Sequence, residues 1–480
     1  MDIISIRFVV LAIASIFIYY LLNPKYRIGY LAILSCGFIA SLNFLLLPYI
    51  LFYSLVNYYI GLKLPASRNK KALYRAGIIL NLTQLIILRY ASFSIDPIFQ
   101  LFDINIQVSK LSEIIVPIGI SYFTLQGIGY IINVKMGWEK PENRFLDFLL
   151  YITFFPKFLS GPIERSNHFL PQLKLVQSFN EQQVSEGLRT ALFGFFKKVV
   201  IANRLAPLVM NTYSDVNAAD GFSLWMILIC QPIYIYFDFS GYTDIAVGLA
   251  KTFGINLLPN FNRPFFSENI TSFWKRFHMS LSSWFNDYVF RQISFKYKKW
   301  GIYSSTFAVL ITFLLFGIWH GGGWTFMILG LLQAVAINYE FFTRKWRLIL
   351  FSKMPKYFRI WFGRIMTYLF YSVSLVFFFS PDINSAFFYF SKLTKIDNVT
   401  LPRLAIEELP LVATISIFVF FMIELIRNDF NDVSNYLESI WLGGKKINIL
   451  FRWVVYYLII LSLLIFIQVG RLQQFIYFTF

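Results

Sequence analysis

The stretch IYSSTFAVLITFLLFGIWHGGGWTFMILGLLQAVAINYEFFT, at residues 302–343, decides the fold class of this chain. Its two apolar runs, 302–319 and 324–343, each come close to the roughly 20 residues that an α-helix needs to cross a bilayer. Between them, His320 stands beside three consecutive glycines. The stretch therefore predicts a pair of membrane helices whose connecting turn carries an imidazole.

The same apolar pattern recurs along nearly the whole chain. Its 480 residues are 57% hydrophobic and only 14% charged, whereas a soluble domain carries about 25% charged residues. We expect an all-α polytopic membrane protein with roughly 11–13 transmembrane or re-entrant helices, forming a single membrane-embedded domain over residues 1–480. Candidate spans lie near 4–22, 29–46, 47–62, 76–92, 113–133, 190–211, 222–250, 302–319, 324–343, 362–380, 409–426 and 450–470, and the short segment 146–160 is expected to be re-entrant.

The net charge of +18 comes from basic residues in short loops between the apolar runs. Such loops are typical of the cytoplasmic side of a membrane protein, so we expect no nucleic-acid partner. The loops 63–75, 291–299 and 344–364 are predicted to be cytoplasmic, which places His320 deep in the membrane or toward its far side. With three histidines, and with both cysteines in apolar stretches, we expect neither a metal site nor a disulfide framework.

Two histidines are candidates for chemistry. Imidazole is the usual general base near neutral pH, and the glycines beside His320 permit unusual φ angles and a close approach to the backbone. The competing interpretation is a packed histidine in a helix break. His278, in WKRFHMS, is a weaker candidate because a histidine on an amphipathic helix is often solvated. His168 is expected to face water.

Charged residues also occur within an apolar segment. Asp238 and Asp244 lie near Gly241, which suggests an interrupted helix. Acids at such depth need partners, so these two either shape a site or lock the core by pairing with Arg263, Lys275, Arg276 or Arg291. Further along, Trp274, Phe277, Leu281, Trp284 and Tyr288 follow helical spacing, which predicts an interfacial or obliquely buried helix.

These motifs together resemble those of the membrane-bound O-acyltransferase family, in particular its bacterial alginate O-acetyltransferase branch. The resemblance is carried by YFDFSGYTDIAVGLAKTFGINLLPNFNRPFFSENITSFWKRFHMSLSSWFNDYVF (236–290) and GIWHGGGWTF (317–326), within a signature core at 236–343. It is supported by VPIGISYFTLQGIGYIINV (116–134), FFPKFLSGPIER (154–165) and FIYFTF (475–480).

The resemblance implies helices around a central tunnel and transfer of an acyl group from a cytoplasmic donor, usually acetyl-coenzyme A, to an acceptor hydroxyl. His320 matches the family's catalytic histidine, and His278 matches its second histidine. Because His320 is expected away from the cytoplasm, a donor entering from inside and an acceptor reached from outside agree with the predicted topology. No permanently bound cofactor or metal is implied.

The sequence departs from this branch at three places. DYVF is not followed by the usual Gly-Gly-Asn-Arg loop, the second hairpin helix has Gln333 and Ala334 where relatives often have His-Gly, and Lys157 stands where relatives often have His. Both matching histidines remain, so we expect an active enzyme. The departures leave open which polymer it modifies.

We therefore expect an O-acyltransferase that acetylates an exported polysaccharide from acetyl-CoA, directly or through an extracytoplasmic SGNH-type acetyltransferase partner, at a bacterial cytoplasmic (inner) membrane. His320 would be the general base, and His278 would orient the donor or stabilise developing charge. The residues expected to bind substrate or shape the tunnel are Arg165, Asp238, Ser240, Asp244, Asn262, Trp274, Arg276, Asp287, Trp319 and Gly321.

Three alternatives remain open. A D-alanyl transferase for teichoic acid would use the same histidines with a carrier-protein donor. A transporter for a lipid-linked sugar would need polar residues along several spans, whereas the polar and glycine residues here concentrate at 236–330. A scaffold for a secretion complex would tolerate substitution of both histidines.

Overall fold

The computed structural model describes residues 3–104, 106–110, 119–175, 178–395, 411–442, 444 and 446–469. Over these ranges the chain is helical and contains no β-strand, apart from one isolated antiparallel bridge between Phe261 and Phe277. The prediction of an all-α protein is therefore confirmed. The closing FIYFTF motif and the first part of the predicted span 113–133 lie outside the described residues.

The chain forms two compact units, and each is described here by itself. Unit 1 comprises Met1–Ala191, Thr243–Pro259 and Ser283–Gln292, and unit 2 comprises Leu192–Tyr242, Asn260–Ser282 and Ile293–Phe480. Four helices continue from one unit into the other: α11 (Glu181–Phe196), α13 (Gly221–Thr252), α15 (Met279–Phe285) and α16 (Arg291–Lys296). The single domain expected from the sequence stays a prediction.

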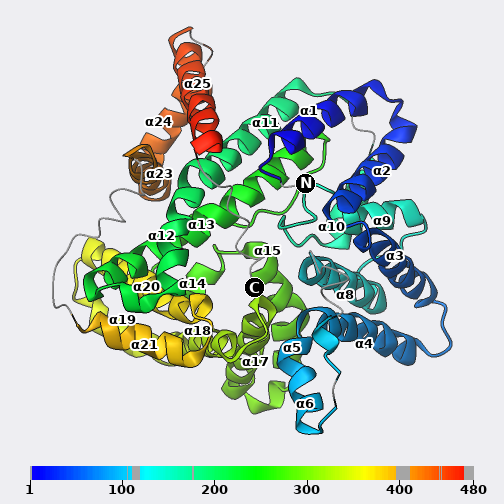
Figure 1. Ribbon diagram of the computed structural model, residues 1–480, viewed down its shortest axis with the longest axis horizontal. Coiled ribbons are helices and arrows are strands. Elements are labelled where there is room, and N and C mark those ends of the chain that lie inside the picture. The colour runs from blue at the N-terminus through cyan, green and yellow to red at the C-terminus, as the bar shows by residue number, and fades with distance from the viewer. Residues whose placement is uncertain are drawn as a thin grey trace. The chain divides into compact units, whose positions relative to one another are not determined.

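Unit 1 is built on helices that begin at capping side chains or end at glycines. Ser5 Oγ accepts a hydrogen bond from the Phe8 N–H at the start of α1, which satisfies one of the first backbone donors of that helix. Left-handed glycines flank α8, and α8 lies beside α4 (Figure 1). The helices are α1 (Ile6–Leu21), α2 (Pro24–Leu42), α3 (Leu46–Lys63), α4 (Lys70–Arg89), α5 (Ala91–Ser94), α6 (Asp96–Leu101), η1 (Val108–Lys110), α8 (Ile120–Met136), α9 (Phe145–Thr153) and α10 (Ser166–Leu173).

The segment predicted to be re-entrant forms the short helix α9 followed by irregular backbone up to α10. Residues 154–164 of this irregular stretch are all buried. A Cβ atom at Gly161 would lie 2.4 Å from the Cα atom of Lys157, so the turn requires glycine. Non-helical backbone enclosed by protein is the kind that a membrane domain tolerates, which agrees with the re-entrant expectation.

Unit 2 is organised around the hairpin of α17 (Ile302–His320) and α18 (Trp324–Phe342). The two helices approach closely at Gly317 and Gly330, where a Cβ atom would meet the carbonyl oxygens of Phe326 and Phe313, each at 2.2 Å. The helix pair expected from the sequence is thus confirmed. The other elements are η2 (Lys197–Ala202), α12 (Asn203–Ser214), η3 (Val216–Ala218), η4 (Pro264–Phe266), α14 (Ile270–Trp274), η5 (Asn286–Phe290, in unit 1), η6 (Lys298–Trp300), α19 (Arg344–Ser352), α20 (Lys356–Phe379), α21 (Ile383–Leu393), α23 (Leu411–Asp429), α24 (Asn431–Leu442) and α25 (Lys446–Val469).

Seven helices in the described part of the chain are long and apolar enough to cross a membrane. Every predicted span overlaps a helix in the described part of the chain, although 190–211 falls on three consecutive elements, α11, η2 and α12, and 29–46 runs past the end of α2 at Leu42. The seven helices are α4, α13, α17, α18, α20, α23 and the Lys446–Ile467 part of α25.

Two details of the sequence interpretation are wrong. Helix α13 continues through Gly241 without interruption. That glycine instead allows α13 to pack closely against residues 194–198. A Cβ atom there would lie 3.0 Å from the carbonyl oxygen of Gly194 and 3.0 Å from the backbone nitrogen of Lys198. The single helix expected along the aromatic stripe is broken between α14 and α15. The stripe residues themselves are buried, as an obliquely buried helix would have required.

Candidate active site

The candidate site in unit 2 begins at the C-terminal end of α17. The helix ends at His320, which is only 6% exposed, and the chain then turns through the three glycines. Gly321 has φ −171° and ψ 152°, an extended conformation open to any residue, so an unusual φ angle is not the reason for this glycine. A Cβ atom at Gly321 would lie 2.2 Å from the Phe326 ring, so the required feature is close approach.

His278 reaches the same site from the break between α14 and α15. It is completely buried and has a φ angle of 47°, in the left-handed region. Non-glycine residues adopt this conformation at a cost of about 1–3 kcal/mol and keep it only where the surroundings determine it. The solvated helix face considered for His278 is therefore excluded. Its ring centroid lies 6.4 Å from that of His320.

Aromatic rings surround the two imidazoles. The Trp319 ring contacts both, with its centroid 5.6 Å from that of His278 and 5.0 Å from that of His320. Phe239 packs edge-on against His278 at 4.5 Å, and Phe316 lies 4.9 Å from His320. Burial among these rings disfavours charge on the His278 imidazole.

Burial holds the pKa of His278, which lies outside the candidate spans, well below the ordinary histidine value. The neighbouring His320 acts in the same direction, because two imidazolium charges this close would repel. His278 is therefore neutral near pH 7. A neutral imidazole offers one N–H donor and one nitrogen acceptor, which suits charge stabilisation or proton transfer.

A cavity of about 20 Å³ borders His320. Its walls are mainly apolar, and Gln333 and Trp274 contribute polar atoms. Trp274 Nε1 donates to Gln333 Oε1 at 3.1 Å, and Gln333 Nε2 donates to Ser374 Oγ at 2.9 Å. Gln333, noted above only as a departure from relatives, thus lines this cavity and links Trp274 to Ser374 by hydrogen bonds. Sequence reasoning missed this role because the bonds join helices far apart in the chain.

Asp238 has a structural partner that the sequence did not suggest. It forms an ion pair with Lys198, and both side chains are fully buried. Lys198 was not among the four basic residues proposed as partners for Asp238 and Asp244. Ser240, two residues further along α13, is also buried.

The remaining predicted residues of unit 2, Asn262 and Arg276, both precede His278 in the chain. Arg276 Nη1 donates to Asn428 Oδ1 at 3.2 Å, and burial beside Arg263 and Arg364 lowers its pKa. Asn262 donates its backbone N–H to the Arg276 carbonyl at 2.9 Å, while its side chain is exposed. Neither side chain is among those lining the cavity beside His320.

The three other predicted residues belong to unit 1. Arg165 Nη2 lies 3.5 Å from Asp287 Oδ2 and 3.4 Å from Ser283 Oγ. Its guanidinium carbon lies 4.8 Å from the centroid of the Tyr288 ring. Asp244 is half-buried on α13. Their proposed role toward the substrate stays a prediction.

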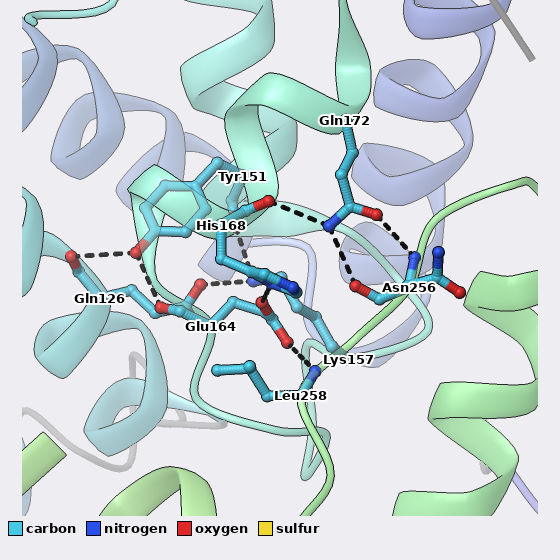
Figure 2. Close-up of polar contacts among 8 residues, drawn as sticks. All are labelled: Gln126, Tyr151, Lys157, Glu164, His168, Gln172, Asn256 and Leu258. Carbon is cyan, nitrogen blue, oxygen red and sulfur yellow. Dashed lines mark hydrogen bonds and ion pairs between the residues drawn. The ribbon is translucent and has the colours of Figure 1, made fainter. Parts of the chain in front are cut away.

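Unit 1 also contains a buried polar cluster around the 154–165 segment, drawn in Figure 2. Lys157 Nζ donates to Gln126 Oε1 and, at 2.6 Å, to the Tyr151 carbonyl. Glu164 accepts the Leu258 N–H at 2.6 Å and pairs with His168 Nδ1 at 2.8 Å. Burial lowers the pKa of Lys157 to about 7.

His168 itself lies at the edge of this cluster. Its side chain is 40% exposed, as expected from the sequence. The hydrogen bond with Glu164 raises the pKa of His168 above its ordinary value. Through Glu164, the cluster connects the irregular segment to the backbone at Leu258. We therefore interpret its contacts as structural.

Residues 142–380 match the model of the membrane-bound O-acyltransferase family. The chain belongs to this family and is a multi-pass membrane protein. The matched region contains both histidines, the α17–α18 hairpin and the cavity described above.

Curated relatives within this family have different named activities. A probable alginate O-acetylase of Pseudomonas aeruginosa is 33% identical over 65% of this chain and 60% of its own length. A peptidoglycan O-acetyltransferase of Helicobacter pylori is 30% identical over 81% of this chain and 77% of its own length. A teichoic acid D-alanyltransferase of Bacillus subtilis is 35% identical over 48% of this chain and 60% of its own length. The chain thus spans about three fifths of the alginate relative that it matches.

Proposed function

We propose that this protein is an O-acyltransferase that moves an acetyl group from acetyl-CoA to a hydroxyl of an exported polysaccharide. The observation that carries the proposal is the buried imidazole pair, one member of which, His320, lines a small apolar cavity at the end of α17. Family membership and the named O-acetyl transfer by two relatives support the reaction class.

In the proposed reaction, His320 accepts the proton of the acceptor hydroxyl as its oxygen attacks the thioester carbonyl carbon. A new C–O bond forms, the C–S bond breaks, and the proton passes from His320 to the departing thiolate. His278, held neutral by burial, donates an N–H hydrogen bond toward the negative charge that develops on the carbonyl oxygen. A histidine base contributes about 10²–10⁴-fold to rate.

The cavity favours a small neutral acyl group. Its volume of about 20 Å³ exceeds the roughly 10–15 Å³ that one water molecule needs, and a methyl group is of similar size. A D-alanyl group would bring an ammonium ion, and no acidic side chain is among the lining residues of this cavity. An ammonium ion would therefore have no carboxylate partner among the lining residues, which supports acetyl transfer.

The D-alanyl transferase remains the second candidate, because the Bacillus subtilis relative is 35% identical over the aligned region. Purified protein in nanodiscs would be given acetyl-CoA or a D-alanyl-loaded carrier protein, and release of free thiol would be followed. The proposal predicts thiol release from acetyl-CoA only. Release from the carrier protein alone would establish D-alanyl transfer instead.

We further propose a bacterial cytoplasmic (inner) membrane location, with the acyl group passed directly or through an extracytoplasmic SGNH-type acetyltransferase partner. The apolar spans and the acetyl-transferring relatives support this placement. Adding a soluble hydrolase-type partner to nanodiscs with acetyl-CoA should raise thiol release. Sugar transport in vesicles without acyl donor would favour the transporter. A lack of thiol release, together with secretion that tolerates substitution of both histidines, would favour the scaffold.

A further inference from the structure

The left-handed conformation of His278 is held by a short segment that precedes it in the chain. Residues 260–262 run antiparallel to residues 276–280, with the isolated bridge between Phe261 and Phe277 at the centre. On one side of the bridge, the Asn262 N–H donates to the Arg276 carbonyl at 2.9 Å. On the other side, the Asn260 carbonyl accepts the Met279 N–H, also at 2.9 Å.

Asn260 makes a second bond to the same helix. Its side-chain Oδ1 accepts the Ser280 N–H at 3.2 Å. Met279 and Ser280 are the first two residues of α15, so Asn260 satisfies the first two backbone donors of that helix. These donors have no partner within the helix, and the side chain of the residue just before a helix ordinarily accepts from the second or third of them.

The residue just before α15 is His278. Its imidazole packs with its centroid 4.5 Å from that of Phe239 and 5.6 Å from that of Trp319, on the side of His320, while the Ser280 N–H goes to Asn260. Asn260 lies on a neighbouring segment, and its oxygens therefore accept the first N–H groups of α15 at the place where the side chain of His278 could otherwise do so. Asn260 is 1% exposed, so water cannot replace its oxygens.

We propose that Asn260 is a positioning residue for His278: by capping α15 in its place, Asn260 fixes the left-handed backbone that directs the imidazole toward His320. This inference rests on the proposed function only for its kinetic consequence. Misplacement of a reacting group by about 1 Å can cost about 10²-fold in rate. Loss of the Asn260 oxygen is therefore expected to lower turnover more than donor binding.

The test uses the full chain in nanodiscs with three substitutions. Asn260→Leu removes the side-chain acceptor at similar size, whereas Asn260→Asp keeps an acceptor that a helix N-terminus favours. Asn256→Ala is the matched control, because that asparagine lies four residues earlier and is exposed. For acetyl-CoA cleavage, we expect N260L to lower kcat by about 10²-fold with little change in KM, and N260D and N256A to stay close to wild type.

A second readout does not depend on activity. The chain has three histidines, so selective ¹⁵N-histidine labelling gives a small set of imidazole signals, and His278→Ala assigns the one of interest. N260L is expected to shift or broaden the His278 signal and to leave that of His168 unchanged. If N260L does not fold, Asn260→Ala, which adds no bulk, takes its place.

The outcomes separate the two claims. An unmoved His278 signal together with wild-type kcat in N260L would overturn the positioning role. Equal loss in N260L and N260D would also overturn it, because the retained acceptor should rescue. A moved His278 signal in a protein whose wild type cleaves no acyl donor would support the positioning role and reject the proposed function.

Discussion

At the scale of single residues, the site depends on keeping one imidazole neutral beside another. Burial and the nearby His320 hold the pKa of His278 well below its ordinary value. A ring held in this way stays neutral as the pH falls, so protonation of His278 should not contribute to any loss of activity in acid.

The neutral state of His278 predicts a limit on the pH–rate profile. As pH falls, the logarithm of kcat/KM for acetyl-CoA cleavage should decline with a slope no steeper than about one, because His278 takes up no proton in this range. The profile is measured from pH 5 to 8 in nanodiscs. A limiting slope of about two would show that both rings take up protons, which contradicts the neutral state assigned to His278.

Sequence reasoning identified both histidines but not what holds them. His320 and His278 could be singled out because the chain has so few histidines and because their flanking motifs resemble those of a known family. The left-handed φ angle of His278 and the cap from Asn260 depend on a contact between two segments, which residue spacing alone does not encode. A break at 275–278 could not be read from an aromatic stripe that keeps helical spacing through it.

At the scale of helices, close contacts between elements fix the site. The hairpin depends on glycines where α17 meets α18, and a buried ion pair joins η2 to α13. The first feature could be predicted in outline from the small residues of the hairpin. The second could not, because Lys198 and Asp238 are 40 residues apart and only the folded chain brings them together.

Gly330→Ala is predicted to destabilise the hairpin. The added methyl would lie 2.2 Å from the Phe313 carbonyl oxygen, so the helices must separate. Overpacking of this kind costs about 1–3 kcal/mol, which should appear as a lower thermal midpoint in detergent. Gly37→Ala is the control, because nothing lies within 4 Å of its added methyl on α2. An unchanged midpoint in G330A would contradict the close packing.

Lys198→Met is predicted to cost about 3–5 kcal/mol of stability, because it leaves the Asp238 carboxylate buried without its charged partner. Asp238→Leu in the same chain removes that unpaired charge and should recover most of the loss. Folded yield and thermal midpoint of the single and double variants measure this. If the double variant is no more stable than K198M, the pair does not carry the stability assigned to it.

At the scale of the whole molecule, stability should depend on pH through Lys157. Burial lowers its pKa from 10.5 to about 7 in the folded protein. Between these values the unfolded chain binds more protons than the folded chain, so the unfolding free energy rises with pH from 7 toward 10.5. Below pH 7 both states are protonated and the dependence from this group ends.

The thermal midpoint of wild type relative to Lys157→Met tests this expectation. The difference between the two proteins should grow in favour of wild type between pH 7 and pH 9, because only wild type gains from the loss of the lysine proton. Taking the difference removes contributions from the other titrating groups that the two proteins share. A pH-independent difference would show that Lys157 keeps its charge in the folded state.

The all-α architecture follows directly from composition, since long apolar runs with few charges can be satisfied only by helices in a membrane. Every predicted span overlaps a helix in the described part of the chain, and the hairpin at 302–343 was predicted with its turn at His320. Element boundaries and breaks, such as the π-helical turn η2 inside the predicted span 190–211, depend on local packing instead.

The measurement that tests the central claim most directly follows acyl transfer with His320→Ala and His168→Ala side by side. Both variants remove one imidazole, but only His320 borders the apolar cavity, whereas His168 lies in the polar cluster around Glu164. We predict that H320A lowers the rate of acetyl-CoA cleavage by about 10²–10⁴-fold and that H168A leaves it within about threefold. Equal rates in H320A and wild type would contradict the account.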